Sequence, residues 1–225
     1  FYSPNDSKEA KIVIVTPVAK GEWRVQTLTD LPHVHRFDIV ERGGVRYLIA
    51  CALKSGHEYK DDWSMPGKVY AAVLPADLSI FDDDHQLPLE VIKDDMLKNH
   101  GYYRVEEDGV TTSVISADNG VFQFYPPAQA GGQWEIKQLL DAAASDAVLV
   151  DLDGDGEMEL TTISPFHGAK ISIYKKNAGK FEEVYTYEKP AEFSHSIFGG
   201  MLAGKPTVVI GHRQGERNLI AFTWD

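Results

Sequence analysis

Short runs rich in Val, Ile, Tyr and Phe recur along the whole chain, and Gly, Pro, Asn or Asp residues bound them. Apolar runs of this length between turn residues are typical of β-strands. Helical periodicity is scarce, and the best candidate for a helix is the short segment from Ile136 to Ala144. The pattern therefore predicts an all-β protein.

The predicted strands recur as a unit of four, and repeats of about 40 to 50 residues indicate the blades of a β-propeller. We therefore predict a single β-propeller domain over residues 1–225, with about four to five blades of four strands. The last blade lacks its outer strand, so either the amino-terminal strands close the ring or the chain is a piece of a larger one. The predicted blades span residues 33–95, 98–141, 145–190 and 193–225, and strands within 11–29 complete or precede a blade.

Composition narrows the range of partners. Hydrophobic residues make up 43% of the 225 residues and charged residues 25%, as in an ordinary globular protein. No apolar run reaches the roughly 20 residues that cross a bilayer, so we expect no membrane span. The 22 Lys and Arg residues against 34 Asp and Glu give a net charge of -12, which disfavours nucleic acid as a partner.

The single cysteine, Cys51, excludes a disulfide framework and a multi-cysteine zinc site, and its apolar neighbours predict a core residue.

An acidic loop lies between two predicted strands of the third blade, with the sequence Asp-Leu-Asp-Gly-Asp-Gly-Glu-Met-Glu. Oxygen ligands at alternate positions of a tight loop, with Gly at the sharp turns, suit calcium, which takes 6 to 8 oxygens. The alternative is a solvated acidic turn without an ion. The predicted side-chain ligands of a structural calcium ion are Asp151, Asp153, Asp155 and Glu159.

Four potential ligands recur at the first residue of the innermost strand in successive blades. Inner strands surround the central channel of a propeller, so equivalent positions would form a ring. Imidazoles with one carboxylate are the ligands that zinc and related divalent metals prefer. The alternative is a set of polar channel residues that bind water and backbone groups. The predicted ligands of this channel metal are His35, His100, His195 and Asp146.

Four motifs resemble the propeller domain of the aldos-2-ulose dehydratase family, which acts on keto-sugars such as glucosone or 1,5-anhydrofructose. They are His33 to Phe37, Lys60 to Gly67, Lys98 to Tyr102 and Asn119 to Phe122. The resemblance implies a seven-bladed ring with zinc at the bottom of the propeller cleft, and it covers part of such a ring. Cupin domains accompany the propeller in this family, and no cupin pattern is visible in this sequence. The acidic loop separately resembles the FG-GAP or VCBS class of propeller repeat.

The resemblance implies a metal-dependent lyase or isomerase that dehydrates a small carbohydrate substrate. Such a reaction needs a polarised carbonyl, a base for the adjacent carbon-bound proton and an acid for the departing hydroxyl. Histidine suits the base, since its ordinary pKa is about 6.5. The candidates for base and acid are His57, His167, His212, Tyr102 and Asp62.

Two other functions stay open from the sequence. One is a non-catalytic, calcium-stabilised propeller that binds carbohydrate or protein. The other is a structural fragment whose channel holds only water, which the remainder of a propeller or an additional domain would complete. Fold alone does not choose between these functions, because propellers host unrelated activities.

Overall fold

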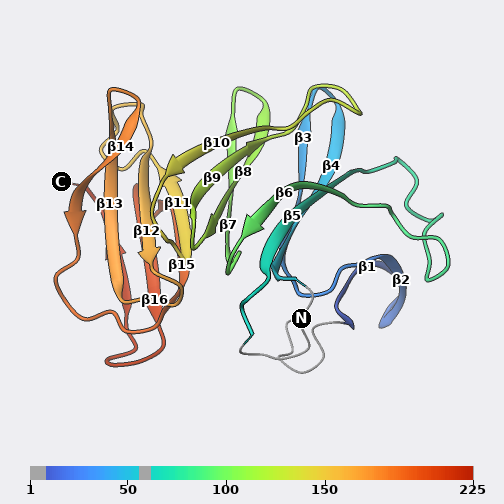
Figure 1. Ribbon diagram of the computed structural model, residues 1–225, viewed down its shortest axis with the longest axis horizontal. Helices are drawn as coiled ribbons and strands as arrows, with labels where there is room; N and C mark the ends of the chain where they lie inside the picture. Colours follow the sequence, from blue (N-terminus) through green and yellow to red (C-terminus); the bar gives the residue numbers. More distant parts are fainter. Residues whose placement is uncertain (1–8, 56–61, 225) are drawn as a thin grey trace. The chain divides into compact units, whose positions relative to one another are not determined.

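The computed structural model describes residues 9–55 and 62–224 (Figure 1). Seventeen β-strands form five antiparallel sheets, and the described residues contain no α-helix. The prediction of an all-β fold is therefore confirmed, whereas the arrangement of the sheets as propeller blades stays a prediction. No described helix has the length and apolar character that crossing a membrane requires.

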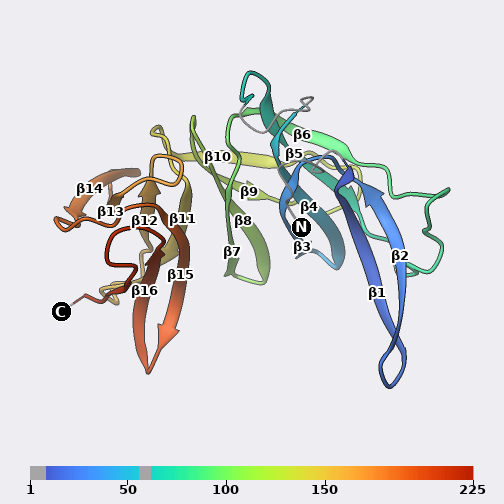
Figure 2. The same cartoon turned by 90° about the horizontal axis from the view of Figure 1, so that it is seen from below.

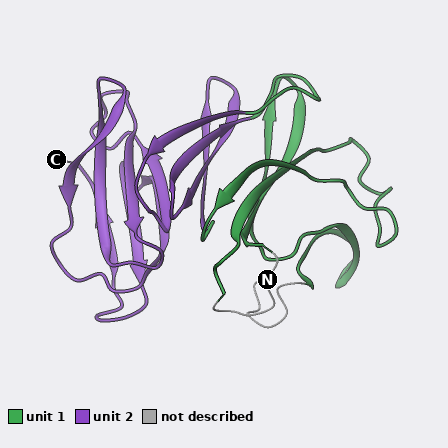
Figure 3. Ribbon diagram, viewed as in Figure 1, with its two compact units in different colours: residues 1–99, 126–134 green, residues 100–125, 135–225 purple. Residues whose placement is uncertain are grey.

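The described chain divides into two compact units (Figure 3). The first comprises residues 1–99 and 126–134, and the second comprises residues 100–125 and 135–225. The prediction of a single domain over 1–225 stays a prediction, and each unit is described by itself below.

The first unit holds a two-stranded hairpin and a four-stranded sheet of order β3-β4-β5-β6. Its buried core includes Ile12 and Leu28 from the hairpin and Leu48 from the sheet. Cys51 is buried in the same sheet, and burial raises the pKa of its thiol to about 12, as expected for a core residue. The strands are β1 (Lys11–Ala19), β2 (Glu22–Asp30), β3 (Val34–Arg42), β4 (Val45–Lys54), β5 (Pro66–Val73) and β6 (Glu90–Met96).

The second unit holds two four-stranded sheets and one three-stranded sheet, each with its strands in sequence order. The strands are β7 (Gly101–Glu107), β8 (Val110–Ala117), β9 (Gly120–Tyr125), β10 (Glu135–Leu140), β11 (Asp146–Val150), β12 (Glu159–Ser164), β13 (Lys170–Asn177), β14 (Lys180–Thr186), β15 (Ser194–Leu202), β16 (Lys205–His212) and β17 (Leu219–Phe222).

The first strands of the three sheets lie side by side, with β11 in contact with both β7 and β15 (Figure 2). Gly199 allows the close approach of β15, since a Cβ atom there would lie 2.6 Å from Val150 Cγ2. The Tyr103 hydroxyl donates a hydrogen bond of 3.1 Å to the Gly199 carbonyl and so ties β7 to β15. Residues at the beginnings of these three strands are therefore brought to one end of the unit.

The segment with the best helical periodicity forms no helix. Residues 136–140 of the segment from Ile136 to Ala144 lie in β10, which pairs antiparallel with β9. Ile136 lies opposite Phe124 in this pairing. Two or three turns of helical periodicity are a weak signal, and cross-strand pairing overrides it here.

Candidate functional site

Three histidines converge at one end of the second unit. His100 directly precedes β7, His167 lies in the turn between β12 and β13, and His195 is the second residue of β15. One ring nitrogen from each lies within 4.8 Å of the other two. His100 is almost fully buried, and the other two are partly buried. We refer to these three residues as the histidine cluster.

A backbone hydrogen bond sets the tautomer of His100. Its Nδ1 lies 3.0 Å from the carbonyl oxygen of Ser145, which can only accept, so Nδ1 carries the proton. The lone pair of Nε2 therefore points to the cluster. Metal-binding histidines commonly donate their second ring nitrogen to a carbonyl in this way, which orients the ring. Ser145 is thus a positioning residue that the sequence analysis missed.

The spacing of the ring nitrogens fits a small metal ion. His100 Nε2 and His167 Nε2 lie 3.3 Å apart. Two ligands of a tetrahedral zinc ion, each about 2.0 to 2.1 Å from the metal, would be separated by about 3.3 to 3.4 Å. The same separation also permits an N–H···N hydrogen bond from His167 to His100. The residues present therefore fit a zinc-like ion, with the remaining coordination position open to water or substrate.

Two aromatic rings hold the cluster in shape. Phe166 stacks on His167 with centroids 4.0 Å apart, and Phe193 stacks on the same imidazole at 4.7 Å. Both His167 and Phe193 have positive φ values, 50° and 56°, so the turns that carry them adopt the left-handed conformation. In the sequence, Phe166 directly precedes His167 and Phe193 lies two residues before His195. This spacing was the signal from which the packing could have been predicted.

The cluster favours the uncharged form of His167. Burial and, to a smaller extent, the nearby His195 and Arg213 together lower the pKa of His167 to about 4. The imidazole is therefore neutral at physiological pH, which is the form that binds a metal or accepts a proton.

The predicted channel ligands are only partly brought together. His100 and His195 meet, and His167 joins them in place of Asp146. The Asp146 carboxylate accepts a hydrogen bond of 3.1 Å from the Ala147 amide, and its oxygens are outside the group of clustered ligand atoms. His35 lies on β3 in the first unit, and all three clustered histidines belong to the second.

The other predicted acid–base candidates occupy separate settings. His212 uses both ring nitrogens within its own turn: Nδ1 lies 2.8 Å from the Gln214 carbonyl, and Nε2 accepts from the Asn218 amide at 3.0 Å. The Tyr102 hydroxyl is paired with Ser113 Oγ at 2.8 Å. Asp62, in the first unit, accepts a 2.9 Å bond from the Ser64 amide. His57 lies outside the described residues.

The acidic loop folds around its own backbone amides. The two carboxylate oxygens of Asp151 accept hydrogen bonds from the Gly154 and Gly156 amides, at 2.8 and 3.1 Å. Glu159 is 1% exposed, and its Oε2 accepts a 2.7 Å bond from the Leu152 amide. Carboxylate oxygens of Asp151, Asp153 and Glu159 lie within 4.8 Å of one another, so three of the four predicted calcium ligands are brought together.

A lysine lies among these carboxylates. Lys175 Nζ contacts Asp153 Oδ2, lies 2.9 Å from Asp155 Oδ2 and lies 3.4 Å from Glu159 Oε1. These contacts raise the pKa of Lys175. Its position follows from the β12–β13 register, in which Leu160 lies opposite Tyr174, so the next pair outward is Glu159 and Lys175. Calcium at this loop stays a prediction, and an ion there would have to displace the ammonium group.

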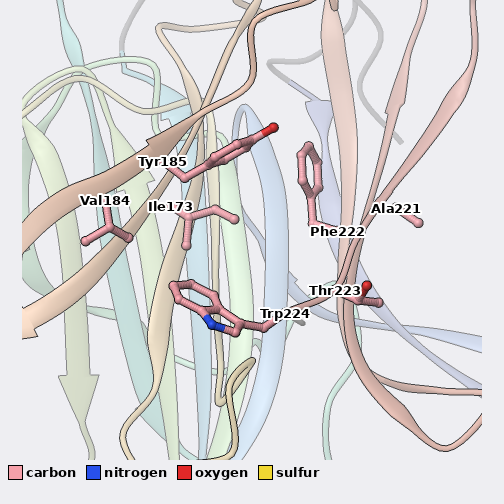
Figure 4. A pocket seen from close by; sticks show the side chains of 7 residues that line it. All are labelled: Ile173, Val184, Tyr185, Ala221, Phe222, Thr223 and Trp224. Carbon is pink, nitrogen blue, oxygen red and sulfur yellow. The ribbon is translucent and has the colours of Figure 1, made fainter.

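A separate hollow of about 470 Å³ lies beside β17 (Figure 4). The rings of Tyr185, Phe222 and Trp224 lie around Ile173 in this view. None of the predicted site residues lines it. The lining is Ile173, Val184, Tyr185, Ala221, Phe222, Thr223 and Trp224. Its lining includes no histidine, carboxylate or lysine, so it offers no acid–base pair, and we place the candidate chemistry at the histidine cluster.

The chain matches no protein-family model, and no curated protein matches its sequence. The resemblance to the aldos-2-ulose dehydratases and to FG-GAP repeats therefore stays a prediction. The function is argued below from the geometry of the histidine cluster.

Proposed function

We propose that this chain is part of a β-propeller that uses the histidine cluster as a metal centre for the dehydration of a keto-sugar. The observation that carries the proposal is the convergence of His100, His167 and His195, with two ring nitrogens at the spacing of zinc ligands. The side-by-side packing of β7, β11 and β15 is consistent with the inner strands of neighbouring blades.

Each residue of the cluster has a defined part in the proposal. His100, oriented by the Ser145 carbonyl, and the neutral His167 would bind a divalent ion together with His195. When bound, such an ion would polarise the carbonyl of a keto-sugar. Phe166 and Phe193 stack on the His167 imidazole and hold it in place.

The reaction would remove water without a change of oxidation state. A base takes the proton from the carbon next to the carbonyl, a carbon–carbon double bond forms, and the hydroxyl on the following carbon leaves with a proton as water. His167 is assigned as a ligand rather than as the base, because its ring nitrogen faces His100 Nε2 at 3.3 Å. His212 is not assigned as the base either, since both of its ring nitrogens are engaged.

Metal analysis with matched variants tests the proposal. After zinc loading and removal of excess ion, we expect near one zinc per chain in the wild type and a large loss in the His100→Ala/His195→Ala double variant. His85→Ala is the control, because His85 is exposed and lies in the first unit. Dehydration of glucosone or 1,5-anhydrofructose, followed by ultraviolet absorbance of the unsaturated ketone, should fall with the zinc content.

If the double variant keeps both its fold and its zinc, the histidine cluster is not the ligand set. Calcium bound without zinc would favour the second candidate, a non-catalytic propeller that binds carbohydrate or protein. The observation that favours this second function is the gathering of Asp151, Asp153 and Glu159 in the acidic loop.

A further inference from the structure

An arginine with no place in the proposed chemistry lies beside the histidine cluster. The Arg213 guanidinium lies over the Phe193 ring, 5.2 Å from its centroid. The same ring stacks on His167 at 4.7 Å and is nearly parallel to His195 at 6.2 Å. A hollow of about 130 Å³ is lined by Phe193, Arg213 and Gln214. A cationic pocket thus adjoins the proposed metal centre.

Backbone hydrogen bonds fix Arg213 in this position. Its amide donates to the Phe193 carbonyl at 3.0 Å, and the Gln214 amide donates to the Glu192 carbonyl at 3.1 Å. These bonds continue the β15–β16 pairing beyond Ser194 and His212. The guanidinium is therefore carried by an extension of the sheet and not by an independent loop.

The charge of Arg213 has no acidic partner within residues 9–55 and 62–224. No ion pair joins it to a described Asp or Glu, although the chain as a whole carries a net charge of -12. Its positive charge reaches the cluster, since it contributes to the lowered pKa of His167. The three imidazoles add no negative charge, so a divalent ion bound there would keep its full charge beside the guanidinium.

We infer that Arg213 forms an anion subsite, and that the substrate is a keto-sugar carrying a carboxylate or a phosphate group. This inference rests on the proposed metal centre. The planar guanidinium offers paired N–H donors that match the oxygens of either group. One end of the substrate would bind the metal through its carbonyl, and the anionic end would occupy the hollow beside Phe193. In a strongly acidic protein, such a local positive site also offsets the repulsion of an anionic substrate.

Calorimetric titration of the zinc-loaded protein tests the subsite. The probes are 2-keto-D-gluconate for the carboxylate, D-fructose 6-phosphate for the phosphate and neutral D-fructose. We expect one or both anions to bind at least about tenfold more tightly than fructose, because a charge-assisted hydrogen bond strengthens binding by at least about this factor. Arg213→Gln should remove that difference without changing the fructose affinity or the zinc content, and Arg213→Lys should restore part of it.

Arg217→Gln is the matched control, because Arg217 is an exposed arginine of the same turn that does not contribute to the lowered pKa of His167. Equal affinities for anions and fructose, or equal effects of Arg213→Gln and Arg217→Gln, would overturn the inference. If the protein binds no zinc, the proposed function fails separately. Titration of inorganic phosphate into the metal-free protein then tests Arg213 alone. A phosphate affinity about tenfold weaker in Arg213→Gln than in the wild type supports the subsite, and an equal affinity rejects it.

Discussion

The second unit holds two groups of side chains that could bind a metal ion, and the two groups avoid electrostatic repulsion in different ways. The histidine cluster gathers imidazoles, and burial keeps His167 neutral. The acidic loop gathers carboxylates, and Lys175 supplies a cation from the neighbouring strand. Neutral ligands can lie close together without an ion, whereas clustered carboxylates repel unless a cation lies among them. The two groups therefore differ in how much they need a metal to be stable.

This difference changes which of the two sequence patterns is the stronger indication of a metal ion. The aspartate motif is the more specific pattern for an ion, yet the chain itself offers a cation there. The histidines are scattered over 96 residues, from His100 to His195 counted inclusively, and no motif joins them. Two of their ring nitrogens, His100 Nε2 and His167 Nε2, nevertheless lie 3.3 Å apart, which is the separation of two zinc ligands.

The largest effect should come from removing the cation of the acidic loop. Lys175→Met leaves Asp153, Asp155 and the buried Glu159 without compensation. We expect the free energy of unfolding in chelator to fall, by less than on breaking a fully buried pair because Lys175 and Asp155 are partly exposed. Urea unfolding followed by Trp fluorescence measures this change.

Lys176→Met is the control for that measurement. Lys176 is the next residue of β13, and its ammonium group lies 5.8 Å from the Phe181 ring, outside the loop carboxylates. A loss of stability in Lys175→Met no larger than in Lys176→Met would show that the ammonium does not stabilise the loop.

The next effect concerns calcium at the same loop. Because calcium must displace Lys175 in the wild type, we expect Lys175→Met to bind calcium at least about tenfold more tightly, a change of about 1.4 kcal/mol. Calcium should also recover the stability of this variant as the ion binds the folded state. Adding Asp153→Asn to Lys175→Met should abolish both effects in calorimetry and thermal unfolding. A wild-type affinity equal to that of Lys175→Met would mean that the ammonium is no barrier to the ion.

The strands were largely predictable because local residues determine them. The sequence Glu-Arg-Gly-Gly before Val45 predicts a tight hairpin, and Gly43 and Gly44 have φ values of 61° and 77°, as such a turn requires. The apolar runs that flank it form β3 and β4. The weak helical period of segment 136–144 does not determine its structure, because residues 136–140 are placed by pairing with β9.

The site was less predictable because its residues interact across different sheets. The repeat placed His100 and His195 at equivalent positions, which pointed to their meeting. It could not show that the turn after β12 would bring His167 to them in place of Asp146. The position of Lys175 beside Glu159 could in principle be predicted from the register of one hairpin. The positions of Arg213 and Ser145 could not, since they depend on a guanidinium that lies over Phe193 and on a carbonyl that faces His100.

The smallest effect is the pH dependence of the metal-free protein. Burial, with smaller contributions from His195 and Arg213, lowers the pKa of His167 to about 4 from 6.5. Between these values the unfolded chain binds a proton at His167 that the folded chain does not, so stability should fall as the pH is lowered from 6.5 to about 4. We expect His167 to contribute about 1 to 2 kcal/mol of this loss, after allowance for its partial exposure. In His167→Phe, which keeps an aromatic ring at this position, the loss of unfolding free energy between pH 6.5 and about 4 should be smaller by that amount, and its slope against pH correspondingly lower. His85→Ala, which removes an exposed histidine of the first unit, is the control. An unaltered slope in His167→Phe would mean that the cluster does not hold this imidazole neutral, and the contrast with the acidic loop would then be lost.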